Sequence, residues 1–106
     1  MSVKIYGSDI FLTRGDTLRI NISIRNYTPV DGDYLRFAMK KQYGDDFPIL
    51  LNREIPIDTM VLQLDPIDTK DLIMGETYVY DIELTKANGD VDTFIAGTIT
   101  IENEVC

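Results

Sequence analysis

Apolar and polar residues alternate along much of the chain, which is the pattern of β-strands that bury one face. The segment 17–25 gives the clearest case, because leucine or isoleucine at every second position alternates with polar residues. Weaker alternation recurs near residues 35–40, 51–55, 60–64, 78–84 and 93–102. The residues that we expect to face inward are Leu18, Ile20, Ile22, Ile24, Phe37, Tyr80 and Ile82.

Turn residues separate these segments. Asp31-Gly32-Asp33 precedes one of them, residues 43–46 follow it, and Asn88-Gly89, a pair that suits a tight hairpin, separates the last two. The segment 65–75 begins with Asp-Pro and ends with Gly, which predicts a short helical turn. About seven strands at this spacing predict an all-β fold, an antiparallel β-sandwich with one short helical turn.

Length, charge and cysteine use narrow the picture further. The 106 residues suit one domain spanning 1–106, and the net charge of −8 argues against nucleic acid and membrane surfaces as partners. From residue 54 onward there are twelve acidic residues and two basic ones. This excess of negative charge serves either solubility or attraction of a basic partner. Cys106 is the only cysteine, so we expect no disulfide. No apolar run approaches the ~20 residues of a membrane span, and the first residues show no secretory signal.

Residue types that carry catalysis are scarce. The chain has no histidine, which removes the commonest general base and a common metal ligand. No serine lies in a nucleophile motif, and there is no glycine-rich phosphate loop. The acidic pairs 45–46, Asp68 with Asp71, and Asp90 with Asp92 do not fit EF-hand spacing, and we interpret them as solvated turn carboxylates. We therefore expect no enzymatic activity, no cofactor and no metal.

Arg14-Gly15-Asp16 spells a tripeptide that integrins bind, but its position predicts a turn that leads into the strongest strand. Glycine lets the backbone turn sharply there, and Asp16 can bond to nearby amides. Gly15 and the alternation that follows it resemble the second strand of immunoglobulin domains. In this resemblance, Ile22 stands at the position of the first disulfide cysteine.

The stretch 72–80 resembles the other half of the immunoglobulin signature. Tyr78 takes the place of the tyrosine-corner residue, and Tyr80 takes that of the second cysteine. Phe37 is our candidate for the tryptophan that packs on the disulfide. The resemblance implies an immunoglobulin-like sandwich without a disulfide, in which the Tyr78 hydroxyl bonds to the backbone of the connection 68–75.

Four stretches along the chain carry a narrower resemblance. They are FLTRGDT (11–17), DTKDL (68–72), GETYVYDI (75–82) and DTFIAGTI (92–99). Together they resemble the N-terminal domain of BppU-type upper-baseplate proteins of phage and prophage tails. The resemblance implies a virion structural role for a protein made in the bacterial cytoplasm. Its partners would be other tail or baseplate proteins.

Some apolar residues do not belong to the inward set. The main candidates are Phe11, Phe47, Leu50 and Phe94. Either the strands twist so that both faces of some strands are partly covered, or these residues form an interface with a tail protein or a second copy of the chain. A different function also stays open, namely a carbohydrate-binding or cell-surface adhesion sandwich. In that case, sugars would stack on Tyr27, Tyr34 and Tyr43.

Overall fold

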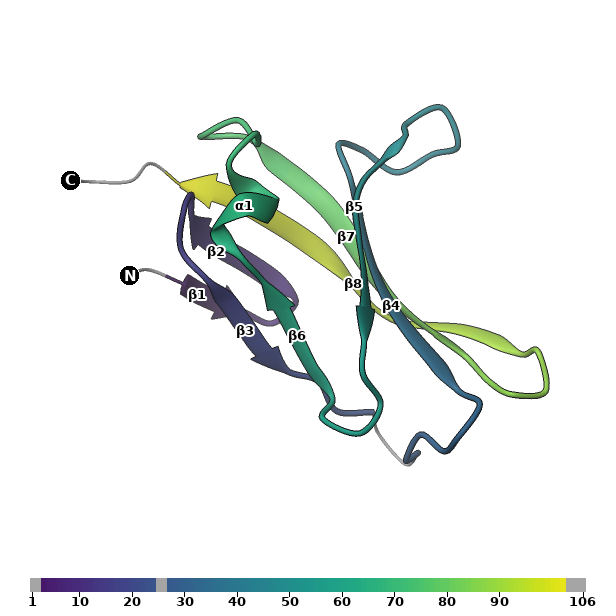
Figure 1. Ribbon diagram of the computed structural model, residues 1–106. Helices are drawn as coiled ribbons and strands as arrows, with labels where there is room; N and C mark the ends of the chain where they lie inside the picture. Colours follow the sequence, from purple (N-terminus) through teal and green to yellow (C-terminus); the bar gives the residue numbers. More distant parts are fainter. Residues whose placement is uncertain (1–2, 25–26, 103–106) are drawn as a thin grey trace.

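Two β-sheets packed face to face form the protein (Figure 1). The computed structural model describes residues 3–24 and 27–102. In chain order, the elements are β1 (Val3–Tyr6), β2 (Asp9–Thr13), β3 (Leu18–Asn21), β4 (Tyr34–Lys40), β5 (Ile49–Ile55), β6 (Val61–Leu64), α1 (Pro66–Thr69), β7 (Thr77–Thr85) and β8 (Val91–Glu102). The larger sheet has the strand order β1-β2-β8-β7-β4-β5, and β3 pairs with β6 in the smaller sheet. The fold is the all-β, immunoglobulin-like sandwich that the sequence predicts, with one short helix.

Strand pairing follows the predicted antiparallel scheme with one exception. Among the described strands, only β2 and β8 pair in parallel. The β1–β2 hairpin raises the number of described strands to eight, and alternation did not reveal it. Three consecutive apolar residues, Ile10, Phe11 and Leu12, stand in β2, so a period of two does not appear there.

The core lies between the two sheets and contains the predicted inward residues. Leu18, Ile22, Phe37, Tyr80 and Ile82 are buried, and Ile20 and Ile24 are partly buried against them. The rings of Phe37 and Tyr80 pack with their centroids 5.6 Å apart. The residues that the resemblance places at the two cysteines and the tryptophan of immunoglobulin domains therefore all belong to one apolar cluster.

Two β-bulges interrupt the larger sheet and change the phase of its strands. Met39 pairs with Leu51 and Lys40 with Ile49, so Leu50 is an extra residue in β5. In the same way, Ile82 pairs with Ile95 and Glu83 with Thr93, which leaves Phe94 as the extra residue in β8. Because a bulge inserts one unpaired residue, strict alternation cannot continue through it.

The Arg14-Gly15-Asp16 tripeptide forms the turn that carries the chain from β2 in one sheet to β3 in the other. The Asp16 N–H donates to the Thr13 carbonyl at 3.0 Å, and Gly15 has a φ of 92°. A turn with positive φ at its third residue strongly favours glycine there. The Arg14 N–H donates to the Glu102 carbonyl at 3.1 Å and so fixes the turn against the end of β8.

The connection from β6 to β7 contains α1 and crosses from the smaller sheet to the larger one. Asp68 is not the solvated carboxylate that the sequence suggested, because it accepts a hydrogen bond from the Asp65 N–H at 2.8 Å and pairs with Arg53 on β5. Tyr78 is buried, and its hydroxyl oxygen accepts a hydrogen bond from the Ile73 N–H at 3.0 Å. This is the bond to the connection that the tyrosine-corner interpretation predicts.

The β7–β8 hairpin confirms the turn predicted from Asn88-Gly89, with a loop one residue longer than the tightest form. The Lys86 backbone N–H donates to the Asp90 carbonyl at 2.7 Å, and the Gly89 N–H donates to the Lys86 carbonyl at 2.8 Å. Gly89 has a φ of 97°. The geometry is that of a three-residue hairpin loop closed by glycine.

Asp33 joins this hairpin to the connection between β3 and β4. Its carboxylate accepts hydrogen bonds from the Tyr27 hydroxyl, from the Val30 N–H at 3.0 Å and from the Ala87 N–H at 3.0 Å. The bond from Tyr27, followed by the bond from Val30, holds the pKa of Asp33 below its usual range. One buried carboxylate therefore holds two loops together.

We expect Tyr78→Phe to lower the free energy of unfolding by about 1–2 kcal/mol, because the Ile73 N–H loses its acceptor. Urea melts of the parent and the variant provide the measurement. Equal midpoints would show that this hydroxyl does not help to hold the connection.

We expect Asp33→Asn to destabilise the protein near neutral pH and to have little effect in acid. A lowered pKa means that the Asp33 carboxylate contributes stability above the unfolded-state value of about 3.9, and this contribution is lost as pH falls through the lower folded-state pKa. Urea melts of both proteins between about pH 7 and pH 2 should show a shrinking difference. A difference that does not change with pH would contradict this role.

Candidate functional site

The four residues predicted as an interface lie in different places. The Phe11 side chain lies on the outward-facing side of β2, since the side chains of its neighbours Ile10 and Leu12 are buried in the core. Phe94 is partly buried and packs against the core, so the bulge gives it a place that alternation could not predict. Phe47 and Leu50 alone belong to the same structural unit, the hairpin formed by β4 and β5.

The tip of the β4–β5 hairpin carries an exposed apolar group, which we call the hairpin tip. It consists of Tyr43, Phe47, Ile49 and Leu50. Tyr43, Ile49 and Leu50 are 57%, 45% and 47% exposed, and Phe47 is partly buried. The Tyr43 hydroxyl donates to the carbonyls of Tyr80 and Gly97 at 3.3 and 3.4 Å, so the loop folds back over the outer face of the larger sheet. Partial desolvation at the sheet surface, together with the negative charge of Asp81, raises the pKa of Tyr43.

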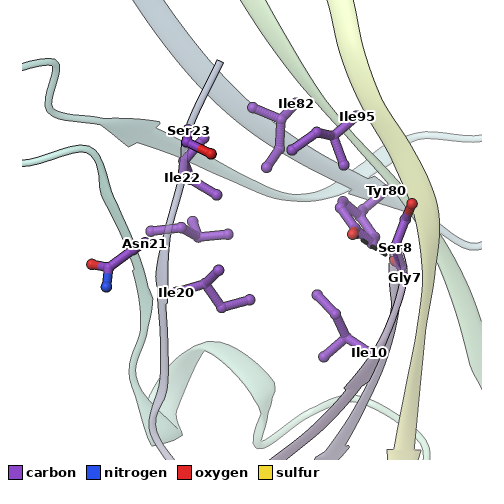
Figure 2. Close-up of a pocket in the computed structure, with 11 residues that line it drawn as sticks. Gly7, Ser8, Ile10, Ile20, Asn21, Ile22, Ser23, Tyr80, Ile82 and Ile95 are labelled. Carbon is purple, nitrogen blue, oxygen red and sulfur yellow. Dashed lines mark hydrogen bonds between the residues drawn. The ribbon is translucent and has the colours of Figure 1, made fainter. Parts of the chain in front are cut away.

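A second candidate lies between the two sheets, where they separate beside β3. A cavity of about 240 Å³ opens there, and we call it the β3 cleft (Figure 2). Its exposed rim residues are Gly7, Ser8, Asn21 and Ser23. Its buried or partly buried wall residues are Ile10, Ile20, Ile22, Leu62, Tyr80, Ile82 and Ile95.

The side chains around the β3 cleft follow the strand alternation. Figure 2 shows Ile20 and Ile22 pointing from the β3 segment toward the larger sheet, while Asn21 points away. Ile82 and Ile95 face them from the other wall. The cleft is therefore lined by aliphatic side chains from both sheets and opens between the β1–β2 turn and β3.

The rim of the cleft on the β3 side is an unpaired strand edge. Among the described strands, β3 pairs only with β6. The Ile22 N–H donates to the Met60 carbonyl at 2.7 Å. The backbone N–H and C=O groups of the even-numbered residues in this segment therefore point toward β6. Because successive residues of a strand direct their backbone groups to opposite sides, Arg19 and Asn21 direct theirs to the free edge, and Ser23 continues this row just beyond the end of β3.

The opposite rim is fixed by Tyr80. Its hydroxyl donates to the Ser8 carbonyl at 2.6 Å. This approach needs glycine at position 97, because a Cβ there would lie 2.2 Å from the Ser8 carbonyl oxygen. Burial, together with the negative charge of Asp9, raises the pKa of Tyr80 to about 12. The β1–β2 turn is thereby held over β8 and forms one wall of the cleft.

The structure assembles no cluster of metal ligands in the part of the chain that it describes. No group of three or more acidic or sulfur ligands within residues 3–24 and 27–102 could hold a metal ion. No helix within these ranges is long and apolar enough to span a membrane.

The tyrosines named for sugar stacking do not form one platform. Tyr27 donates to Asp33, and the Lys86 ammonium lies 4.7 Å from the centre of its ring, so one face of the ring is occupied. Tyr34 begins β4, whereas Tyr43 lies beyond the other end of this strand. A sugar could stack on one of these rings, but the three rings do not line a common surface.

No protein-family model matches the chain, and no match is found among curated proteins. The resemblance to baseplate proteins remains a prediction from the residues quoted above.

Sequence reasoning located half of the hairpin tip and missed the β3 cleft. Phe47 and Leu50 stood out because they broke the alternation. The cleft residues Ile20 and Ile22 looked like ordinary core positions, and only the pairing of β3 with a single neighbour reveals the free edge. Strand neighbours are long-range contacts, so a single sequence carries little signal for them.

We expect Tyr80→Phe to remove an alkaline loss of stability that the parent shows. A raised pKa means that protonated Tyr80 contributes stability below the unfolded-state value of about 10, and this contribution is lost as pH rises toward about 12. The parent should therefore be more stable than the variant near pH 8, and the difference should shrink between about pH 10 and pH 12. The other tyrosines are common to both proteins and cancel in the comparison. A constant difference in urea midpoints would contradict the assignment.

Proposed function

We propose that this protein is a protein-binding module without catalytic activity, and that it works as a structural part of a phage or prophage tail or baseplate. The observation that carries the binding role is the hairpin tip. Two large aliphatic side chains, Ile49 and Leu50, are about half exposed there on an edge strand. Edge strands are normally guarded by charged residues, and grouped exposed apolar residues mark interaction surfaces.

The bulge at Leu50 explains why these side chains are available. It inserts one residue into β5 opposite Met39 and Lys40, so the side chains of Ile49 and Leu50 cannot both point toward the core. Tyr43 folds onto the sheet through its hydroxyl and supports the loop from the other side. An apolar surface on a supported loop can enter an interface with little loss of conformational entropy.

The tail setting is supported by the resemblance of the stretches 11–17, 68–72, 75–82 and 92–99 to the baseplate family. The net charge of −8, concentrated in the second half of the chain, favours partners with a basic surface. In this role the sandwich would dock onto neighbouring tail proteins or onto a second copy of itself. A specific contact needs roughly 1,000 Å² of buried surface, so the hairpin tip would be the centre of a larger interface.

We expect Leu50→Glu to weaken binding, because the added charge would be desolvated without a partner. Asn52→Glu is the matched control, since it adds the same charge to an exposed position of the same strand. Light scattering measures self-association, and titration calorimetry against purified tail and baseplate proteins measures binding. The proposal predicts a loss of roughly tenfold or more for Leu50→Glu and little change for Asn52→Glu.

Three results would overturn the proposal. A parent protein that stays monomeric and binds no tail protein would remove the assembly role. Equal losses in Leu50→Glu and Asn52→Glu would point to general charge repulsion. A saturable response of tyrosine fluorescence to glycans would favour a sugar-binding function. Phe94→Glu is not a useful probe, because Phe94 packs against the core and a charge there would change stability as well as binding.

A further inference from the structure

We propose that the free edge of β3 and the cleft behind it bind an extended segment of a partner polypeptide, which adds a third strand to the smaller sheet. The inference rests on the proposal that this protein binds other polypeptides, but it concerns a surface separate from the hairpin tip. Strand addition of this kind takes its affinity from backbone hydrogen bonds and its specificity from pockets for alternate side chains.

The backbone half of the site is the row formed by Arg19, Asn21 and Ser23. Their N–H and C=O groups point away from β6, at the spacing of two residues that a paired strand requires. The side chain that could guard this edge is engaged elsewhere, because the Arg19 Nε donates to the Gln63 side chain on β6 at 3.1 Å. The edge therefore offers a ladder of hydrogen-bonding groups to an extended chain.

The side-chain half of the site is the β3 cleft. Every second side chain of an added strand would point inward, toward Ile10, Ile82 and Ile95 on the larger sheet. The cavity of about 240 Å³ is far larger than the ~30 Å³ of one water and smaller than the roughly 300–1,000 Å³ of sites for drug-sized ligands. Its size and aliphatic walls suit branched side chains at alternate positions of a peptide.

A second copy of this chain fits the cleft less well than a separate segment. In a second copy, Ile20 and Ile22 are already packed in its own core, so its β3 could pair with the edge but could not fill the cleft. The β1 strand is already paired with β2. The geometry thus favours a partner segment whose side chains are free on both faces.

The test selects peptides from a displayed random library of about nine residues, a length that covers a typical strand. The proposal predicts enrichment of peptides with aliphatic residues at alternate positions. A synthetic copy of the most enriched peptide should slow amide hydrogen exchange at Asn21 and Ser23. It should also bind the variant Asn21→Pro roughly tenfold more weakly, because proline removes one N–H from the free edge and no bond to β6.

Matched variants separate this site from its alternatives. Asn21→Ser keeps the edge N–H and should bind the peptide as the parent does. Leu50→Glu should also bind it normally, since the hairpin tip lies elsewhere. Circular dichroism checks that Asn21→Pro folds, and Ser23→Pro removes the next edge N–H if it does not.

Several outcomes would overturn the inference. They are no enrichment, enrichment without alternation, and binding that survives both proline variants. Loss of peptide binding in Leu50→Glu would place the site at the hairpin tip, which supports the proposed function while rejecting the strand-addition site. A parent dimer that dissociates in Asn21→Pro would assign the edge to a second copy of the chain instead.

Discussion

The hydroxyl of Tyr80 is the polar atom that holds the β1–β2 turn against the rest of the larger sheet. Tyr80 is buried in the core and packs against Phe37, so its hydroxyl would be costly to bury without a partner. The Ser8 carbonyl supplies that partner, and it can approach only because residue 97 has no Cβ. A single hydrogen bond thus couples the core, the β1–β2 turn and β8.

Other polar links join elements of the sandwich that lie far apart in the sequence. Arg53 lies on the inward phase of β5, opposite Phe37, and its pairing with Asp68 joins this edge strand to α1. Asp33 joins the loops at the end of the sandwich. The apolar cluster between the sheets supplies the general stability, and these links determine which loops stay together.

The fold was largely readable from the sequence, and the failures have specific causes. Alternation located the buried faces around Leu18, Phe37 and Ile82, because each strand there buries one of its faces in the core. It left Phe94 outside the inward set, and the bulge that shifts the phase within β8 lets this residue pack against the core. Asp68 was misjudged because its partner Arg53 is distant in the sequence. Leu50 stood out correctly as a break in the pattern, although its exposure depends on the bulge and on the free edge of β5.

The β3 cleft shows why a site can exist where no motif does. Its elements are ordinary core isoleucines and backbone groups, and the site arises only because the smaller sheet stops at two strands opposite a sheet of six. Two strands alone make a marginal sheet, so β3 and β6 are held mainly by packing against the core. A third strand would add hydrogen bonds to β3 and cover Ile20 and Ile95 at the same time. Because such a segment would bind the folded chain and not the unfolded one, its occupancy and the stability of the smaller sheet are thermodynamically linked.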